Sequence, residues 1–103
     1  MTSQGNSRTW EFSEPPNFLV AVARTVLAAE EPVYCIRHTN DGGWIFFGSP
    51  ARIPAFRTRL VQASLGDVVA RHPYLIEFAR LPIGAQVERY PAESPWLRSI
   101  LKR

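Results

Sequence analysis

The chain has 103 residues, a length that suits one domain, and its hydrophobic (46%) and aromatic (12%) fractions exclude wholesale disorder. The net charge of +3 is uneven, because residues 1–51 hold three arginines against five acids while residues 52–103 hold nine basic residues against four acids. A single cysteine, Cys35, excludes an intramolecular disulfide and fits a reducing compartment.

The first residues predict a polar tail ahead of the folded part. Residues 1–8 are polar and we expect them to be mobile, with residues 9–103 forming the globular domain. The tail has no apolar core, so no signal peptide is expected. The longest apolar run, residues 18–23, is far shorter than the roughly 20 residues that span a bilayer. These features predict a cytoplasmic protein with no membrane partner.

Three short elements are predicted before Pro32. Residues 10–12 suggest an opening strand, which the two prolines at 15–16 would end. Residues 18–22 are a bounded apolar run with β-branched members, which favours a buried strand. Residues 24–29 are good helix formers with room for about two turns.

The most informative stretch is residues 33–48. Two β-branched and aromatic runs, near 33–38 and 44–48, flank the sequence Thr-Asn-Asp-Gly-Gly. Asparagine and aspartate tolerate left-handed backbone angles and glycine adopts positive φ at little cost, so this pattern is typical of a β-hairpin.

Further helices and strands are predicted in the second half. Residues 59–63 favour a strand, and Ser64 followed by Asp67 matches a capping box that opens a helix over 64–72. A second short helix is predicted over 74–80, after Pro73.

The last two elements complete the expected fold. Residues 86–90 alternate as an edge strand does, and residues 94–101 suggest a last helical turn capped by Ser94. The predicted class is therefore α+β, with short helices packed on a small antiparallel sheet built around the 33–48 hairpin.

Short motifs occur in an order that resembles a known family. The motifs are Trp-x-Phe, Pro-Pro-Asn, Asp-Gly-Gly-Trp-x-Phe-Phe and Leu-Pro-x-Gly, and they resemble a family of small bacterial proteins, some grouped with immunity proteins of toxin systems. The matching residues are Trp10, Phe12, Pro16, Asn17, Asp41, Gly42, Gly43, Trp44, Phe46, Phe47, Leu81, Pro82 and Gly84. That family carries no established catalytic residues, so the resemblance implies a non-enzymatic α+β domain.

Candidate catalytic groups are few. His38 and Asp41 could pair across the hairpin turn, but an exposed histidine beside a turn aspartate is the simpler expectation. Cys35 and His38 are three residues apart in a strand and would point to opposite faces, so we expect a small buried cysteine. His72 is expected to end a helix. One cysteine and two distant histidines make no zinc pattern, and no metal, cofactor or enzymatic activity is predicted.

Two binding functions stay open. Arg52, Arg57 and Arg59 form a basic segment around Phe56, a combination that can grip phosphate and stack on bases, so a small nucleic-acid-associated protein is the alternative. No recognition-helix or RNA-binding motif accompanies this segment, which makes a nucleic-acid partner the less favoured prediction.

A protein-interaction module is the favoured prediction, with a toxin as the sharpest candidate partner. Tryptophan and arginine are enriched at interface hot spots. Binding that weakens steeply with salt, and that is lost when the three arginines are replaced by glutamine, would indicate nucleic acid and not a protein partner. Each tryptophan could equally be a core residue, and the sequence leaves the oligomeric state open. The predicted partner-binding residues are Trp44, Asp41, His38, Arg52, Phe56, Arg57 and Arg59.

Overall fold

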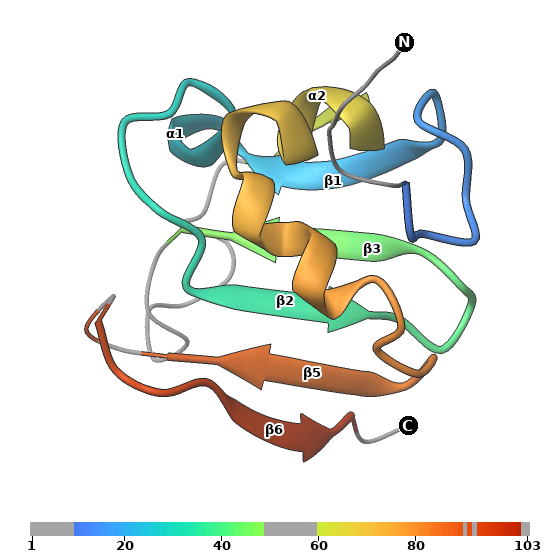
Figure 1. Cartoon of the computed structure of the whole chain (residues 1–103), viewed down its shortest axis with the longest axis vertical. Helices are drawn as coiled ribbons and strands as arrows, with labels where there is room; N and C mark the ends of the chain where they lie inside the picture. The colour runs from blue at the N-terminus through green and yellow to red at the C-terminus, as the bar shows by residue number, and fades with distance from the viewer. Residues whose placement is uncertain (1–9, 49–59, 90, 92, 102–103) are drawn as a thin grey trace, which may run out of the picture.

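The computed structural model describes residues 10–48, 60–89, 91 and 93–101. Within them, six strands form one sheet in the order β4-β1-β3-β2-β5-β6 (Figure 1). The strands are β1 (Leu19–Ala23), β2 (Cys35–His38), β3 (Trp44–Phe47), β4 (Leu60–Ser64), β5 (Ala85–Glu88) and β6 (Leu97–Ile100). The helices are α1 (Arg24–Leu27), α2 (Leu65–Arg71) and the 3-10 helix η2 (Pro73–Phe78).

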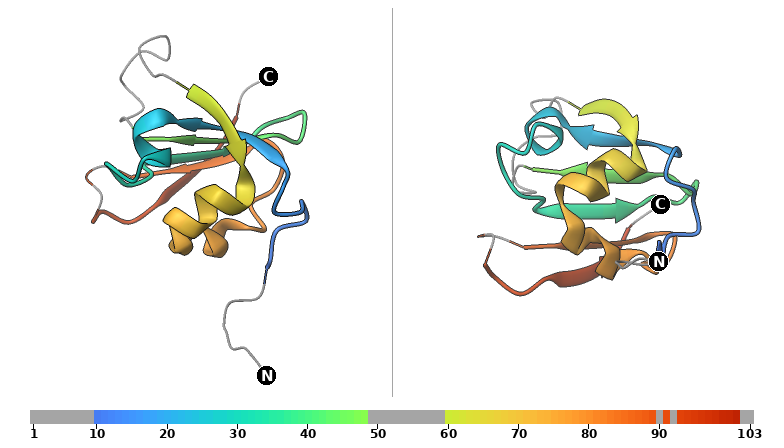
Figure 2. Two further views of the ribbon diagram at one scale, coloured as in Figure 1. Left: turned by 90° about the horizontal axis from the view of Figure 1, so that it is seen from above. Right: turned by 45° about the horizontal axis from the view of Figure 1, so that its top comes forward.

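The core lies between one face of the sheet and the layer formed by α2 and η2, which lie on the same side (Figure 2). Side chains alternate along each strand, so every second residue of β1, β2, β3 and β5 points into this layer. The largest fully buried side chains are Trp44, Phe46, Ile36, Leu65, Leu75, Val22, Val26, Val33, Val68 and Cys35. We call the opposite face, turned away from α2 and η2, the far face.

The sheet is mixed, which corrects the prediction of an antiparallel sheet. β1 runs parallel to β3, with Ala21 opposite Ile45, while the other neighbouring strands are antiparallel. β2 and β3 pair over four residues, from Cys35 opposite Phe47 to His38 opposite Trp44. The chain leaves β1 through α1 and forms β2 before β3 enters the gap between them. Alternation in the sequence specifies faces and not strand order, so this insertion could not be foreseen.

The helical predictions agree with the structure in position and differ in detail. Ser64 is the N-cap of α2, and its hydroxyl accepts a hydrogen bond from the Asp67 amide at 3.2 Å. The segment after Pro73 is a 3-10 helix, and α1 is a single turn that ends before Ala29, whose φ is +61°. None of the described helices is long and apolar enough to cross a membrane.

Two predictions near the chain ends are wrong, and a third is right about the strand but wrong about its edge position. Residues 10–12 form no strand, although Phe12 is a core residue. Residues 85–88 form an interior strand, because β5 pairs with β2 on one side and β6 on the other. Residues 97–100 form β6 in place of a helical turn, since this pairing satisfies the β5 amides that face away from β2.

Candidate functional site

The β2–β3 turn holds an exposed carboxylate in a fixed position. Gly42 has φ +91°, and the Thr39 amide donates to the Gly43 carbonyl at 2.8 Å. The Asp41 carboxylate accepts hydrogen bonds from the Thr39 hydroxyl and from the Gly43 amide. These bonds, the hydroxyl first, lower the pKa of Asp41 below its usual value, so this exposed group is ionised at neutral pH.

A groove on the far face lies beside this turn. It is an open, shallow hollow of about 630 Å³ between β4, β1, β3 and the turn. Its lining is Leu19, Val20, Ala21, Thr39, Asn40, Asp41, Gly43, Trp44, Ile45, Leu60, Val61 and Gln62. Leu19 is 57% exposed and Leu60 39% exposed, so two large apolar side chains of the lining face solvent. Leu19 lies at the end of β1 beside the β2–β3 turn and its ionised carboxylate, whereas Leu60 lies opposite Ala23 at the other end of the ladder. We call this feature the far-face groove.

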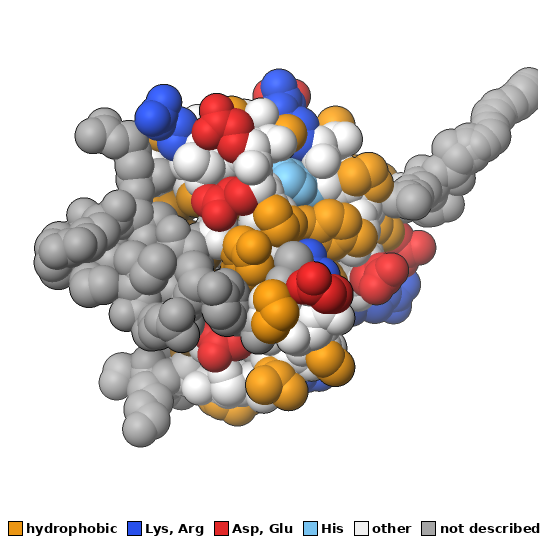
Figure 3. Space-filling model, turned by 90° about the vertical axis from the view of Figure 1, so that its left-hand side faces the viewer, with side chains coloured by type: hydrophobic (Ala, Val, Ile, Leu, Met, Phe, Trp, Pro, Cys, Tyr) orange, Lys and Arg blue, Asp and Glu red, His pale blue; other side chains and the backbone are white. Residues whose placement is uncertain are grey.

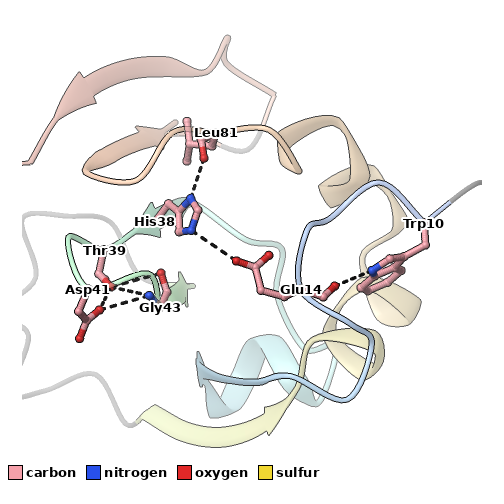
Figure 4. A network of polar contacts seen from close by, with 7 residues as sticks. All are labelled: Trp10, Glu14, His38, Thr39, Asp41, Gly43 and Leu81. Carbon is pink, nitrogen blue, oxygen red and sulfur yellow. Dashed lines mark hydrogen bonds and ion pairs between the residues drawn. The ribbon is translucent and has the colours of Figure 1, made fainter.

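His38 lies on the opposite face of β2 and does not pair with Asp41. It is 8% exposed, so the expectation of an exposed histidine is wrong. Its Nδ1 lies 2.7 Å from the Leu81 carbonyl oxygen and its Nε2 lies 3.6 Å from Oε2 of Glu14 (Figure 4). A carbonyl oxygen only accepts, so Nδ1 carries a hydrogen and Nε2 faces the carboxylate.

Glu14 reaches His38 from the irregular N-terminal segment. The Trp10 indole donates to the Glu14 carbonyl at 2.7 Å, which fixes the turn that carries the carboxylate (Figure 4). Glu14 Oε1, His38 Nε2 and Trp44 Nε1 are buried and find no hydrogen-bond partner within the described residues. No periodic signal marks Glu14 in the sequence, so this half-buried acid could not have been identified without the fold.

Trp44 is a core residue, so its indole is not exposed at the surface for a partner. It is 2% exposed, and its ring stacks on His38 with centroids 3.9 Å apart. Phe12 packs edge-on against it at 5.3 Å, and Phe46 stacks at 6.0 Å. Trp44 alternates with Ile45 along β3, and that alternation directs the indole into the core and Ile45 to the groove.

His72 differs from His38 because its ring nitrogens both have partners. Its Nε2 lies 2.7 Å from the Val26 carbonyl oxygen, so that nitrogen carries the hydrogen, and Nδ1 lies 3.3 Å from the Tyr74 hydroxyl. The same hydroxyl accepts from the Val33 amide at 3.0 Å. His72 caps α2 as expected and joins α1, η2 and the start of β2.

The end of the sheet where β2 begins carries a second aromatic and cationic cluster. Hydrophobic side chains gather in the middle of this end, with acidic ones around them (Figure 3). Arg89 lies 4.2 Å from the ring centre of Trp96 and 5.2 Å from that of Tyr74. Its guanidinium also donates to the Val33 carbonyl, so these contacts tie the chain after β5 to the start of β2.

Cys35 points to the far face, opposite to His38, so the two do not form a dyad. The thiol is buried, as predicted, and lies 3.9 Å from Oε1 of Gln86. Burial, which outweighs the nearby Arg37 charge, raises the pKa of Cys35 to about 11. The nucleophilic thiolate is therefore a minute fraction at neutral pH.

We expect Cys35 to react with thiol reagents only as fast as the chain opens. Labelling of the native protein near pH 8 should be far slower than labelling in denaturant, because the thiol is buried and protonated. Cys35→Ala should lower the free energy of unfolding by about 1 kcal/mol through a small cavity, and partner binding should be unchanged. Rapid native labelling that abolishes binding would contradict a structural role.

The other predicted site residues fall into two groups. Asp41 lies at the rim of the far-face groove. The arginine segment lies outside the described residues, and it comprises Arg52, Phe56, Arg57 and Arg59. Sequence reasoning missed Leu19 and Leu60, although period-two alternation of the two strands could have placed both on the face opposite the core.

Among the described residues, no three His, Cys, Asp or Glu side chains lie close enough together to hold a metal ion.

Comparison of the chain with protein-family models, with curated proteins and with solved structures found no match.

Proposed function

We propose that this chain is a non-enzymatic protein-interaction module whose far-face groove receives an apolar side chain of a partner protein. The observation that carries the proposal is the exposure of two large apolar side chains, Leu19 and Leu60, at the two ends of the β1–β4 ladder, in a hollow of about 630 Å³. Apolar side chains in a concave site supply binding energy because their burial against a partner removes them from water.

The rim of the groove supports a partner that carries a positive charge. Asp41 is exposed and ionised, and its hydrogen bonds to Thr39 and Gly43 hold it at the edge of the apolar floor. A lysine or arginine next to the partner's apolar anchor would complement this charge. Rim charges of this kind set orientation and association rate more than affinity, so the leucines should dominate binding.

The arrangement of the ionisable groups supports a binding role over catalysis. His72 uses both ring nitrogens in structural hydrogen bonds, and Cys35 is buried with a raised pKa. His38 and Asp41 occupy opposite sides of the sheet. A nucleophile next to a base, on which covalent catalysis depends, is not assembled from these residues.

The resemblance of the short motifs to a family with immunity relatives extends the proposal to neutralisation of a bacterial toxin. In that form, the partner is a toxin encoded beside this chain's gene. Co-expression of the two proteins should restore growth of cells that the toxin alone arrests. Failure of rescue with a demonstrably bound toxin would remove the immunity proposal and leave the binding proposal in place.

Leu19→Arg should weaken binding of the partner protein at least about 30-fold. This loss is equivalent to removal of a hot spot of about 2 kcal/mol. The reason is that a guanidinium in the groove replaces an apolar contact and repels the partner's cation. The measurement is calorimetry or interferometry with purified partner.

Ile83→Arg is the matched control, since Ile83 is 59% exposed and Leu19 57% exposed, and it does not line the groove. Its affinity should stay within a few-fold of the original. Equal losses in the two variants would refute the groove as the binding site. Retention of single-stranded nucleic acid that weakens steeply with salt would instead favour the nucleic-acid alternative.

A further inference from the structure

The β6 edge of the sheet exposes an unusual amount of apolar surface. All four residues of β6 are exposed, and α2 and η2 lie over other strands (Figure 1). Five large hydrophobic residues are exposed in the described part of the chain, and three of them, Ile83, Leu97 and Ile100, lie in β6 or next to its partner strand β5. The far-face groove accounts for the other two.

The hydrogen-bond register shows which backbone groups of this edge are free of the β5 ladder. The Leu101 amide donates to the Gly84 carbonyl at 2.6 Å, and the pairing continues with Ser99 opposite Gln86 and Leu97 opposite Glu88. Backbone groups of an antiparallel strand alternate in direction. The amides and carbonyls of Arg98 and Ile100 therefore point away from β5, outward from the sheet.

We propose that this edge pairs with β6 of a second copy of the chain, antiparallel and centred on Ser99. Two identical antiparallel strands are related by a two-fold axis perpendicular to the sheet, so a residue at the centre lies opposite itself. With Ser99 at the centre, Arg98 of each copy lies opposite Ile100 of the other. Each strand turns two amides and two carbonyls outward, those of Arg98 and Ile100. The two strands together then form four hydrogen bonds across the interface.

Charge disfavours the register centred on Arg98. Centring on Arg98 would place two guanidinium groups directly opposite each other, which is destabilising. In the Ser99 register each Arg98 stem lies along an Ile100 side chain, and its charged end can stay in water. On the far face, Leu97 would lie opposite Leu101 of the other copy, so the exposed Leu97 gains an apolar neighbour.

The two-fold axis also fixes how the two grooves are related. Because it is perpendicular to the sheet, α2 and η2 of both copies lie on one side and both far faces on the other. The dimer would therefore present two far-face grooves in the same direction. This consequence alone rests on the proposed function; the dimer itself rests on the β6 edge.

Cysteine cross-linking tests the register. In a Cys35→Ala background, Ser99→Cys places two thiols at a pair without direct backbone hydrogen bonds, whose Cα atoms are about 4.5 Å apart. Ile100→Cys is the matched control, because its two Cα atoms would be roughly 8 Å apart, too far for a disulfide. Under mild oxidation the Ser99→Cys chain should form covalent dimers at least about tenfold faster.

The mass of the native chain in solution tests the interface without a cysteine. Sedimentation equilibrium over a wide concentration series should show the mass rising toward twice the monomer value. Arg98→Pro removes an outward amide that the β5 ladder does not use, so the variant should keep its circular dichroism spectrum and remain a monomer. Leu97→Arg, which keeps the backbone unchanged, should weaken self-association in the same direction.

Two results would overturn the proposal. One is a native chain that stays monomeric throughout the concentration series. The other is a Ser99→Cys chain that cross-links no faster than Ile100→Cys. The two proposals fail separately. A monomeric Arg98→Pro chain that still binds its partner protein would show that binding at the groove does not need the dimer, and a native dimer that binds no partner would leave the dimer in place without the proposed function.

Discussion

Trp44→Ala is expected to lower the free energy of unfolding by about 3–5 kcal/mol. The indole is fully enclosed by Phe12, Phe46 and the ring of His38, and its removal would leave a cavity at the centre of the core. Since small domains are stable by about 5–15 kcal/mol, this one change would remove a large part of the total. Urea unfolding followed by circular dichroism measures the loss.

Trp44→Phe is the matched control. It keeps an aromatic ring on His38 and also removes the buried indole N–H that has no partner among the described residues. We expect it to cost less than half as much as the alanine variant. If Trp44→Ala unfolds at the same urea concentration as the native chain, the indole cannot be a core residue. Partner binding should be tested through Leu19, because a loss caused by Trp44→Ala would reflect unfolding.

The sequence predicted α2 and β1 because neighbouring residues determine where each begins and which side chains it buries. Ser64 and Asp67 open α2 because an N-cap needs only two residues at a fixed spacing. The bounded apolar run at residues 18–22 corresponds to β1. These cases depend on capping, turn chemistry and side-chain alternation, all of which are written within a few neighbouring residues.

Long-range pairing determined what the patterns missed. Residues 97–100 follow a helix-start signal in Ser94 and Pro95, yet they pair with β5. A single isolated helical turn is costly to nucleate, whereas a strand adds its hydrogen bonds to a sheet that already exists. The parallel pairing of β1 with β3 likewise depends on how strands that are distant in the sequence are ordered within the sheet. Propensity over a short window contains neither fact.

The candidate site was predictable only in part for the same reason. Asp41 could be foreseen as an exposed turn carboxylate, and its hydrogen bonds to Thr39 and Gly43 are local. His38 could not be foreseen as buried, because its partners come from Glu14 and from the Leu81 carbonyl, more than twenty residues away on either side.

The contact between His38 and Glu14 should be the strongest polar coupling of the N-terminal segment. His38→Ala and Glu14→Ala are each expected to lower the free energy of unfolding by about 1–3 kcal/mol, because each removes one side of a contact between the buried His38 and the half-buried Glu14. The double variant should cost at least about 1 kcal/mol less than the sum of the two. Denaturant unfolding of the four chains completes this cycle.

Glu11→Ala is the matched control within the same segment. Glu11 lies 3.5 Å from Arg80, whose side chain is 86% exposed, and an exposed ion pair contributes about 0–1 kcal/mol. Glu14→Gln distinguishes charge from hydrogen bonding, since an amide can donate to Nε2 of a neutral His38. Full stability in the glutamine variant would show that the donor matters and the charge does not. Additive losses in the cycle would show that Glu14 and His38 stabilise the chain independently, and the N-terminal segment would then be held chiefly by Phe12 in the core.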